Sequence, residues 1–234
     1  MLAITRRELS SYFTAPIAYL FISAFYVIGG IFFFFSSILQ STTDMAGTFS
    51  SIFSYAIFLI PVLTMRMMSE ELKHKTDQAL LTAPISLFSL VMGKFLGAFI
   101  VYCLGLASTV LYAFAISMYA ALDWSVVIGN IFGLLLVGAS MIAMGMFISS
   151  LTENQIIAAI GSFVSMMLFL LMGSIAPAIP IPVLAVFMAD FSLVSRYTPF
   201  TMGILDITSL VFFLSICAVF VFLTIRVFEK KRWS

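Results

Sequence analysis

The chain has 234 residues, of which 63% are apolar and only 9% are charged, and its formal net charge is +1. A water-soluble fold of this composition would lack the polar groups that cover a protein surface, so a membrane protein with several spanning helices is the class that remains. The composition also offers no basic patch for nucleic acid, and we expect no nucleic-acid partner.

The basic residues are unevenly distributed. Ten of the eleven lysines and arginines fall in three clusters, at residues 6–7, 66–94 and 226–232, and Arg196 is the exception. Because cytoplasmic loops retain Lys and Arg, this pattern predicts that both chain ends and the segment after the second span lie in the cytoplasm. The segments that this topology places outside carry Asp44, Asp123, Asp190 and Asp206.

Residues 1–15 predict an amphipathic helix that lies in the cytoplasmic membrane interface. One side of this helix carries Leu2, Leu9, Tyr12 and Phe13, and the other carries Arg7, Glu8 and Ser11. The alternative is that the segment serves only as a charged flank that orients the first span. Thr14 to Pro16 then end the helix, and Pro16 suits the first turn of the next one.

Six apolar stretches approach or exceed the roughly 20 residues that cross a bilayer. They are residues 17–39, 49–65, 88–121, 126–150, 155–175 and 207–226. The first is long enough to remain as a spanning helix, and it does not resemble a cleaved signal peptide. The third is overlong, so we expect it to begin outside the hydrocarbon, to tilt, or to break near Gly105.

Residues 66–87, between the second and third spans, hold the densest mixture of charges. Glu71 and Lys75 are four residues apart, as are Lys73 and Asp77, and such pairs stabilise a short exposed helix. Pro84 is expected to end it. The sequence therefore predicts a cytoplasmic helix between these two spans.

The long connection of residues 176–206 is placed outside, between the fifth and sixth spans. Four prolines interrupt it, although its remaining residues are largely apolar. The stretch Val183 to Phe191 is too short to cross the membrane. We expect it to enter the outer leaflet packed against protein, since irregular backbone cannot face lipid.

Several kinds of chemistry are missing from the spans. They contain no Asp, Glu or His, which disfavours ion-coupled carriers and proton pumps. His74 has no second histidine to share a metal, and Cys103 and Cys217 are expected to be small apolar residues. Gly93-Lys94 lacks the preceding glycine of a phosphate-binding loop. We therefore expect no catalytic, cofactor or metal site here, and any ATP must be hydrolysed by another polypeptide.

Small and flexible residues suggest how the spans pack. Gly93 with Gly97, and Gly129 with Gly133, have the spacing that allows two helices to approach closely. Methionines on the fourth and fifth spans could line an adaptable apolar pathway, or could simply pack between helices. These methionines are Met141, Met144, Met146, Met166, Met167 and Met172.

The charged segment matches a known pattern. Arg66 to Glu71, Lys75 to Ile85 and Gly93 to Phe95 resemble the R-x-x-S-E-E, G-T-x-E-L-L-x-x-P and G-K-F motifs of type-2 ABC-transporter permeases, particularly those of the gliding-motility and copper-processing type. Residues 7–19 and 199–206 resemble the start and the end of the same permeases. The resemblance thus covers essentially the whole chain.

The resemblance implies one all-α permease domain over residues 1–234, in the bacterial cytoplasmic membrane. Such a permease is a non-catalytic subunit of an ATP-driven exporter. It pairs with a second copy or a homologous permease, and separate ABC ATP-binding subunits hold ATP and Mg. An additional envelope subunit is a further candidate partner, and residues 176–206 would form re-entrant outer helices.

Carried over to this chain, the resemblance places a coupling helix in residues 66–87, where the ATP-binding subunit would dock. The docking residues are Glu70, Glu71, Lys73, Lys75, Thr76, Asp77, Leu80 and Leu81, and the interface helix contributes Arg6, Arg7 and Glu8. Lys75 stands where the family has Gly, and Gln78 where it often has Glu. These departures are expected to tune the choice of partner.

Two other functions remain open from the sequence. A non-transporting membrane subunit could transmit the motion of the ATPase to another envelope protein. An uncoupled channel is the weaker alternative, because the span interiors carry no charge for an ion pathway. The substrate class is also open between a lipid, an amphipathic peptide and a drug-like molecule.

Overall fold

The structure is a computed structural model that describes residues 1–75 and 86–233, and every regular element within those residues is helical. The long helices are α2 (Ile17–Phe33), α3 (Ala46–Thr64), α6 (Leu87–Ser117), α7 (Trp124–Ser150), α8 (Gln155–Ile175) and α11 (Ile207–Trp233). The shorter elements are α1 (Leu2–Thr14), the π-helix η1 (Phe34–Ile38), α4 (Ser69–Lys73), the 3-10 helix η2 (Ala176–Ala178), α9 (Pro182–Asp190) and α10 (Leu193–Thr201).

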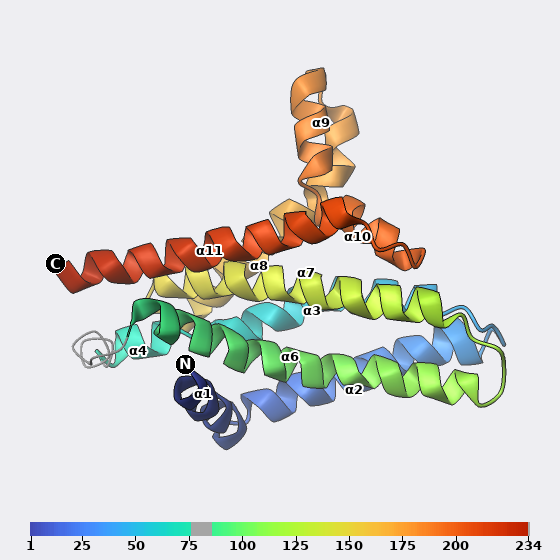
Figure 1. Ribbon diagram of the computed structural model, residues 1–234, viewed down its shortest axis with the longest axis horizontal. Helices are drawn as coiled ribbons and strands as arrows, with labels where there is room; N and C mark the ends of the chain where they lie inside the picture. The colour runs from blue at the N-terminus through green and yellow to red at the C-terminus, as the bar shows by residue number, and fades with distance from the viewer. Residues whose placement is uncertain (76–85, 234) are drawn as a thin grey trace.

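Six helical stretches of the described chain are long and apolar enough to cross a membrane, and each overlaps one of the long helices. The predicted all-α fold with six spans is therefore confirmed. Both chain ends lie at the same end of the bundle, together with α1 and α4 (Figure 1). We call it the basic end, because the three basic clusters of the sequence lie on elements gathered there.

The overlong third span is a single unbroken helix, α6, so the expected break near Gly105 is wrong. Gly105 instead lets α2 approach closely. A Cβ atom added at this glycine would lie 3.1 Å from the ring of Phe25 and 3.3 Å from that of Phe21. Helix α6 continues through Gly105, since glycine lowers helix propensity but keeps its backbone N–H donor.

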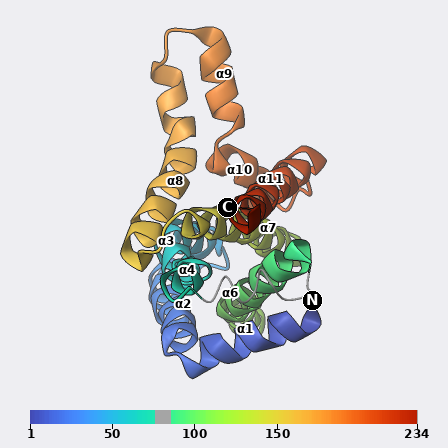
Figure 2. The same cartoon turned by 90° about the vertical axis from the view of Figure 1, so that its left-hand side faces the viewer.

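Helix α7 is central, since it packs against α3, α6, α8, α10 and α11 (Figure 2). Gly129 and Gly133 bring α10 close: a Cβ atom at Gly129 would lie 2.8 Å from the carbonyl oxygen of Phe200. The small-residue spacing thus marks a close contact, although with a short outer helix rather than another span. Four methionines are fully buried between helices, as ordinary packing requires: Met141, Met144, Met146 and Met166.

Neutral hydrogen bonds between tyrosine hydroxyls and backbone carbonyls connect the spans. Tyr102 of α6 donates to the Leu134 carbonyl of α7 at 2.8 Å, and Gly138 lies one turn further along α7. In a helix the side chain of residue i+4 lies next to the carbonyl of residue i. Because Gly138 has no side chain, the Leu134 carbonyl stays accessible to the tyrosine hydroxyl. The same arrangement occurs twice more in α2, each time with a glycine four residues after the accepting carbonyl. The Tyr112 hydroxyl donates to the Tyr26 carbonyl, with Gly30 following, and the Tyr55 hydroxyl donates to the Phe25 carbonyl, with Gly29 following.

The connection between α8 and α11 extends away from the other helices. We call residues 168–190, which comprise the end of α8, η2 and α9, the arm (Figures 1 and 2). Helix α9 has no buried residue, and Val183 is 81% exposed. Within the described residues the main contacts of α9 are with η2, α8 and α10, and its packing against further protein stays a prediction. Whether it re-enters a membrane stays a prediction.

Candidate functional site

The polar groups of the described chain concentrate at the basic end, where the link between α3 and α4 meets α7. Ser149, in the last turn of α7, accepts the backbone N–H groups of Met68 and Ser69, both at 3.1 Å. Its hydroxyl also donates to the Met65 carbonyl at 3.1 Å. The first turn of a helix has N–H groups without internal partners, so this one serine fixes the start of α4 to α7.

Lys94 of α6 is the most deeply buried charged residue at this end, with 3% of its side chain exposed. Its ammonium group lies 2.8 Å from Glu71 of α4 and 3.3 Å from Glu8 of α1, and donates to the Met67 carbonyl at 2.9 Å. An ammonium group has three N–H donors, and these contacts occupy all three. Burial of a charge is tolerated only with such pairing.

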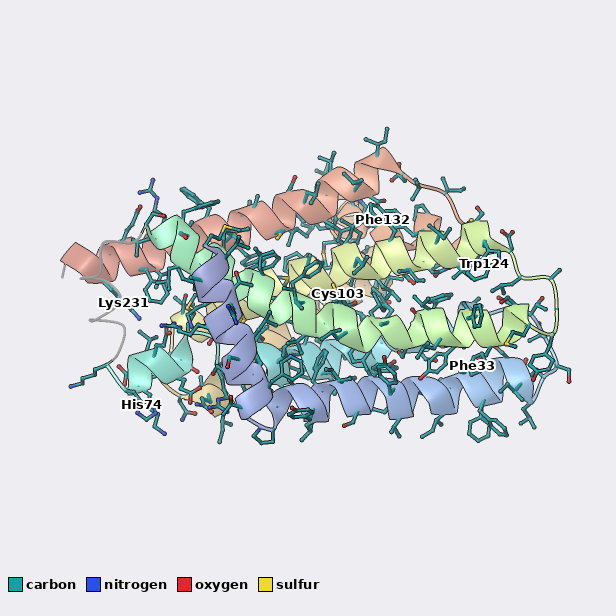
Figure 3. The ribbon with its side chains drawn as sticks, turned by 60° about the horizontal axis from the view of Figure 1, so that its bottom comes forward. Phe33, His74, Cys103, Trp124, Phe132 and Lys231 are labelled. Atoms are coloured by element: carbon teal, nitrogen blue, oxygen red, sulfur yellow. The ribbon has the colours of Figure 1, made fainter. Side chains whose placement is uncertain are left out.

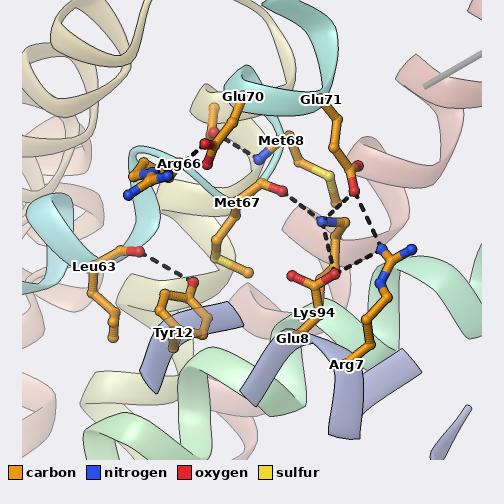
Figure 4. Close-up of polar contacts among 11 residues, drawn as sticks. Arg7, Glu8, Tyr12, Leu63, Arg66, Met67, Met68, Glu70, Glu71 and Lys94 are labelled. Carbon is orange, nitrogen blue, oxygen red and sulfur yellow. Dashed lines mark hydrogen bonds and ion pairs between the residues drawn. The ribbon is translucent and has the colours of Figure 1, made fainter. Parts of the chain in front are cut away.

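Arg7 completes the group from the other side (Figure 4). One of its terminal nitrogens lies 2.9 Å from Oε1 of Glu8 and 3.4 Å from Oε1 of Glu71. The hydrogen bond to Glu8 raises the pKa of the Arg7 guanidinium, so Arg7 stays charged. We call Arg7, Glu8, Glu71 and Lys94 the charge cluster. It joins three elements that are far apart in the sequence: α1, α4 and α6.

Two glycines let α1 reach α6. A Cβ atom at Gly93 would lie 2.7 Å from Cγ2 of Ile4, and one at Gly97 would lie 3.0 Å from Cβ of Glu8. The predicted close-packing spacing therefore holds α1 against α6, and it brings Glu8 within reach of Lys94. Tyr12 adds a hydrogen bond from α1 to the Leu63 carbonyl at 3.2 Å.

The faces of α1 differ from the expected ones at one residue. Glu8 was expected on the polar side with Arg7, but its side chain is 13% exposed and points to Lys94. Leu2, on the side expected to meet the membrane interface, is 83% exposed. A helical projection groups residues by angle alone, and it cannot include an attraction from a lysine on another helix.

Comparison with protein families decides the class to which this arrangement belongs. The family model described as "ABC-2 family transporter protein" matches residues 38–228. The chain belongs to this family. No curated protein matches it. This ABC-2 protein is thus a multi-pass membrane subunit of an ABC transporter, and such subunits are generally non-catalytic and work with an ABC ATP-binding partner.

The structure describes only part of the predicted docking segment of this ABC-2 protein. Helix α4 ends at Lys73, and Lys75 has a φ of +55°, so the expected continuous helix with a Glu71–Lys75 pair is wrong. Glu71 pairs instead with Lys94 and Arg7. Thr76, Asp77, Leu80 and Leu81 lie outside the described residues.

The remaining predicted residues divide into two groups. Lys73 and Lys75 are exposed beside His74, and Glu70 is half-buried and paired with Nε of Arg66 at 2.7 Å. Glu71 is turned inward, as are Glu8 and, in part, Arg7. The exposed residues can contact a partner, whereas the inward residues hold α4 in place.

Sequence reasoning missed Lys94 and Ser149 as members of this site. Lys94 was grouped with the basic loop residues, and Ser149 resembled any serine at the end of a span. The burial of Lys94 beside the carboxylates of Glu8 and Glu71 depends on where α1 and α4 meet α6. Only the Gly93 to Gly97 spacing indicated that another helix would come so close.

Proposed function

We propose that this ABC-2 subunit is the permease of an ATP-driven exporter. Two copies form a dimer, and a separate ATP-binding subunit docks on residues 66–87 of each. ATP and Mg are held in that partner. The observation that carries the proposal is that the start of this segment is fixed to three helices while Lys73, His74 and Lys75 remain exposed beyond it.

The charge distribution supports the orientation. Both chain ends and the docking segment gather at the basic end, and basic residues are retained on the cytoplasmic side. An ATP-binding subunit resides where ATP is, in the cytoplasm. We therefore assign the basic end to the cytoplasmic face of a bacterial inner membrane.

The fixed geometry suggests how force would enter the bundle. A displacement of α4 by the ATP-binding subunit would pull on Lys94 and Arg7 through Glu71, and on α7 through Ser149. Separating a buried charge from its partners is costly, so α1, α4, α6 and the end of α7 would move together rather than shear apart. The long helices α6 and α7 would carry that movement to the opposite end.

A charge-reversal experiment tests the docking surface. Purified permease carrying both Lys73→Glu and Lys75→Glu should retain its thermal unfolding temperature, because both side chains are exposed, and should lose copurifying ATP-binding subunit and its ATPase activity. Lys230→Glu, an exposed lysine of α11 at the same end, is the matched control. Equal retention of the ATP-binding subunit by the double variant and the control would contradict docking at this segment.

The alternative function, a subunit that passes ATPase motion to another envelope protein, is favoured by the arm, whose apolar residues are left uncovered by this chain. Inside-out vesicles distinguish the two functions. An exporter complex accumulates its solute inside the vesicle when ATP is added outside. A complex that only transmits motion hydrolyses ATP without moving a solute across the bilayer. Native mass spectrometry of the complex would show two permeases with two ATP-binding subunits if the proposed assembly is correct.

A further inference from the structure

The outward side of α1 forms an open groove that shares only Arg7 with the charge cluster. It has a volume of about 890 Å³, and its polar lining consists of Arg6, Arg7, Ser10, Ser11 and Thr14. Helix α1 lies across the long helices, at the end that also carries His74 and Lys231 (Figure 3). In the view along the bundle α1 occupies the periphery (Figure 2), and the groove residues Arg6, Ser10, Ser11 and Thr14 are exposed.

The groove is cationic because of how the charge cluster is built. Glu8 is the only acidic residue of α1, and it points away from the groove, toward Lys94. Among the residues that the structure describes, none that lines the groove carries a carboxylate. Within the described chain, Arg6 makes no polar contact, and Arg7 uses a single terminal nitrogen in its ion pairs. Two guanidinium groups therefore have N–H donors available for an anion.

The position of the groove indicates which anion it meets. Helix α1 ends at Thr14, and the first spanning helix begins at Ile17, so the groove lies at the boundary of the hydrocarbon region. Leu2 also lines it, and its side chain is 83% exposed. A phosphate held by arginines, beside hydroxyl groups and an apolar side chain, is the chemistry of a phospholipid at the membrane surface.

We propose that this groove of α1 binds the headgroup of an anionic phospholipid from the leaflet at the basic end. The guanidinium groups of Arg6 and Arg7 bind the phosphate, and the hydroxyls of Ser10 and Ser11 donate to the remaining headgroup oxygens. The exposed Leu2 contacts the acyl region. This binding is a property of the permease alone and does not depend on an ATP-binding subunit.

The test measures lipid binding to the purified full-length permease in detergent by native mass spectrometry. Phosphatidylglycerol is titrated, with phosphatidylcholine as the neutral lipid and glycerol phosphate as the soluble anion. Arg6→Gln should weaken phosphatidylglycerol binding about fivefold, the loss of one basic residue near a headgroup. Arg6→Lys keeps the charge without the planar fork and should lose less. Lys230→Gln should leave the binding unchanged.

Three results would overturn the proposal. Equal weakening by Arg6→Gln and Lys230→Gln would show diffuse attraction to the basic end rather than a site. Equal binding of phosphatidylcholine would show that the headgroup charge is not recognised. Glycerol phosphate binding as well as the lipid would identify a site for a soluble anion. Unchanged thermal unfolding of Arg6→Gln, which is exposed and unpaired, ensures that a loss of binding is not a loss of fold.

Discussion

The charge cluster and the arm differ in how much of their environment this chain supplies. At the basic end, Lys94 satisfies all three of its donors with groups from α1, α4 and the link before α4. In the arm, apolar side chains such as Val183 and Val186 have more than half of their surface exposed. A charge buried without partners is too costly to persist, whereas an apolar surface can be covered by lipid or by another chain. The geometry of the first region is therefore fixed within the chain, and that of the second depends on its surroundings.

Breaking the charge cluster should give the largest effect. Lys94→Met removes the buried cation of the charge cluster and leaves Glu8 and Glu71 to share Arg7, so we expect the free energy of unfolding in detergent to fall by about 3–5 kcal/mol. Adding Glu71→Gln should restore part of the loss, since it removes one of the two carboxylates that then share Arg7.

The matched control for this variant is Lys230→Met, at an exposed lysine of the same end, for which we expect a change of less than about 0.5 kcal/mol. Similar losses for the two lysine variants would mean that the cluster does not stabilise the fold.

Gly138 and Gly30 lie beside the tyrosine-to-carbonyl hydrogen bonds between the spans, and they differ in how much space is left for a side chain. A Cβ atom at Gly138 would lie 2.2 Å from the ring of Tyr102, whereas one at Gly30 would lie 3.5 Å from the hydroxyl of Tyr112. Gly138→Ala should therefore lower the free energy of unfolding by about 1–3 kcal/mol through overpacking. Gly30→Ala should be neutral or stabilising by up to about 1 kcal/mol, because alanine favours a helix. Denaturant titration in micelles compares them, and equal effects would refute the close contact at Gly138.

The arm should give the smallest effect. Val183→Asn replaces an exposed side chain and should change the free energy of unfolding of the detergent-solubilised monomer by less than about 0.5 kcal/mol. Val127→Asn, at a buried residue of the first turn of α7, should cost about 1–3 kcal/mol in the same denaturant titration. A large loss at Val183 would show that the arm packs against the bundle after all.

Hydropathy and charge were sufficient to predict the six spans, because crossing a bilayer requires long apolar helices. The predicted stretch 155–175 coincides with α8, while α11 continues beyond its predicted end at residue 226. Its basic last turns extend the helix, since cations near a helix C-terminus interact favourably with its dipole. Hydropathy and helix-end charges depend only on the residues of one segment, so the sequence of that segment is sufficient to predict its helix.

The pairing at the basic end could not be predicted in the same way. Glu71 has Lys75 four residues ahead, and a local rule assigns them to each other. The chain leaves the helical conformation after Lys73, and a buried lysine from α6 takes the carboxylate instead. That outcome depends on three elements meeting at once, and the sequence indicated only the glycines that allow two of them to touch.

The tyrosine-to-carbonyl bonds have a consequence for how this protein responds to acid. A hydroxyl donating to a backbone oxygen carries no net charge at physiological pH, so these cross-links between spans keep their strength as protons are added. Acid unfolding of this protein should therefore not begin at these contacts between the spans.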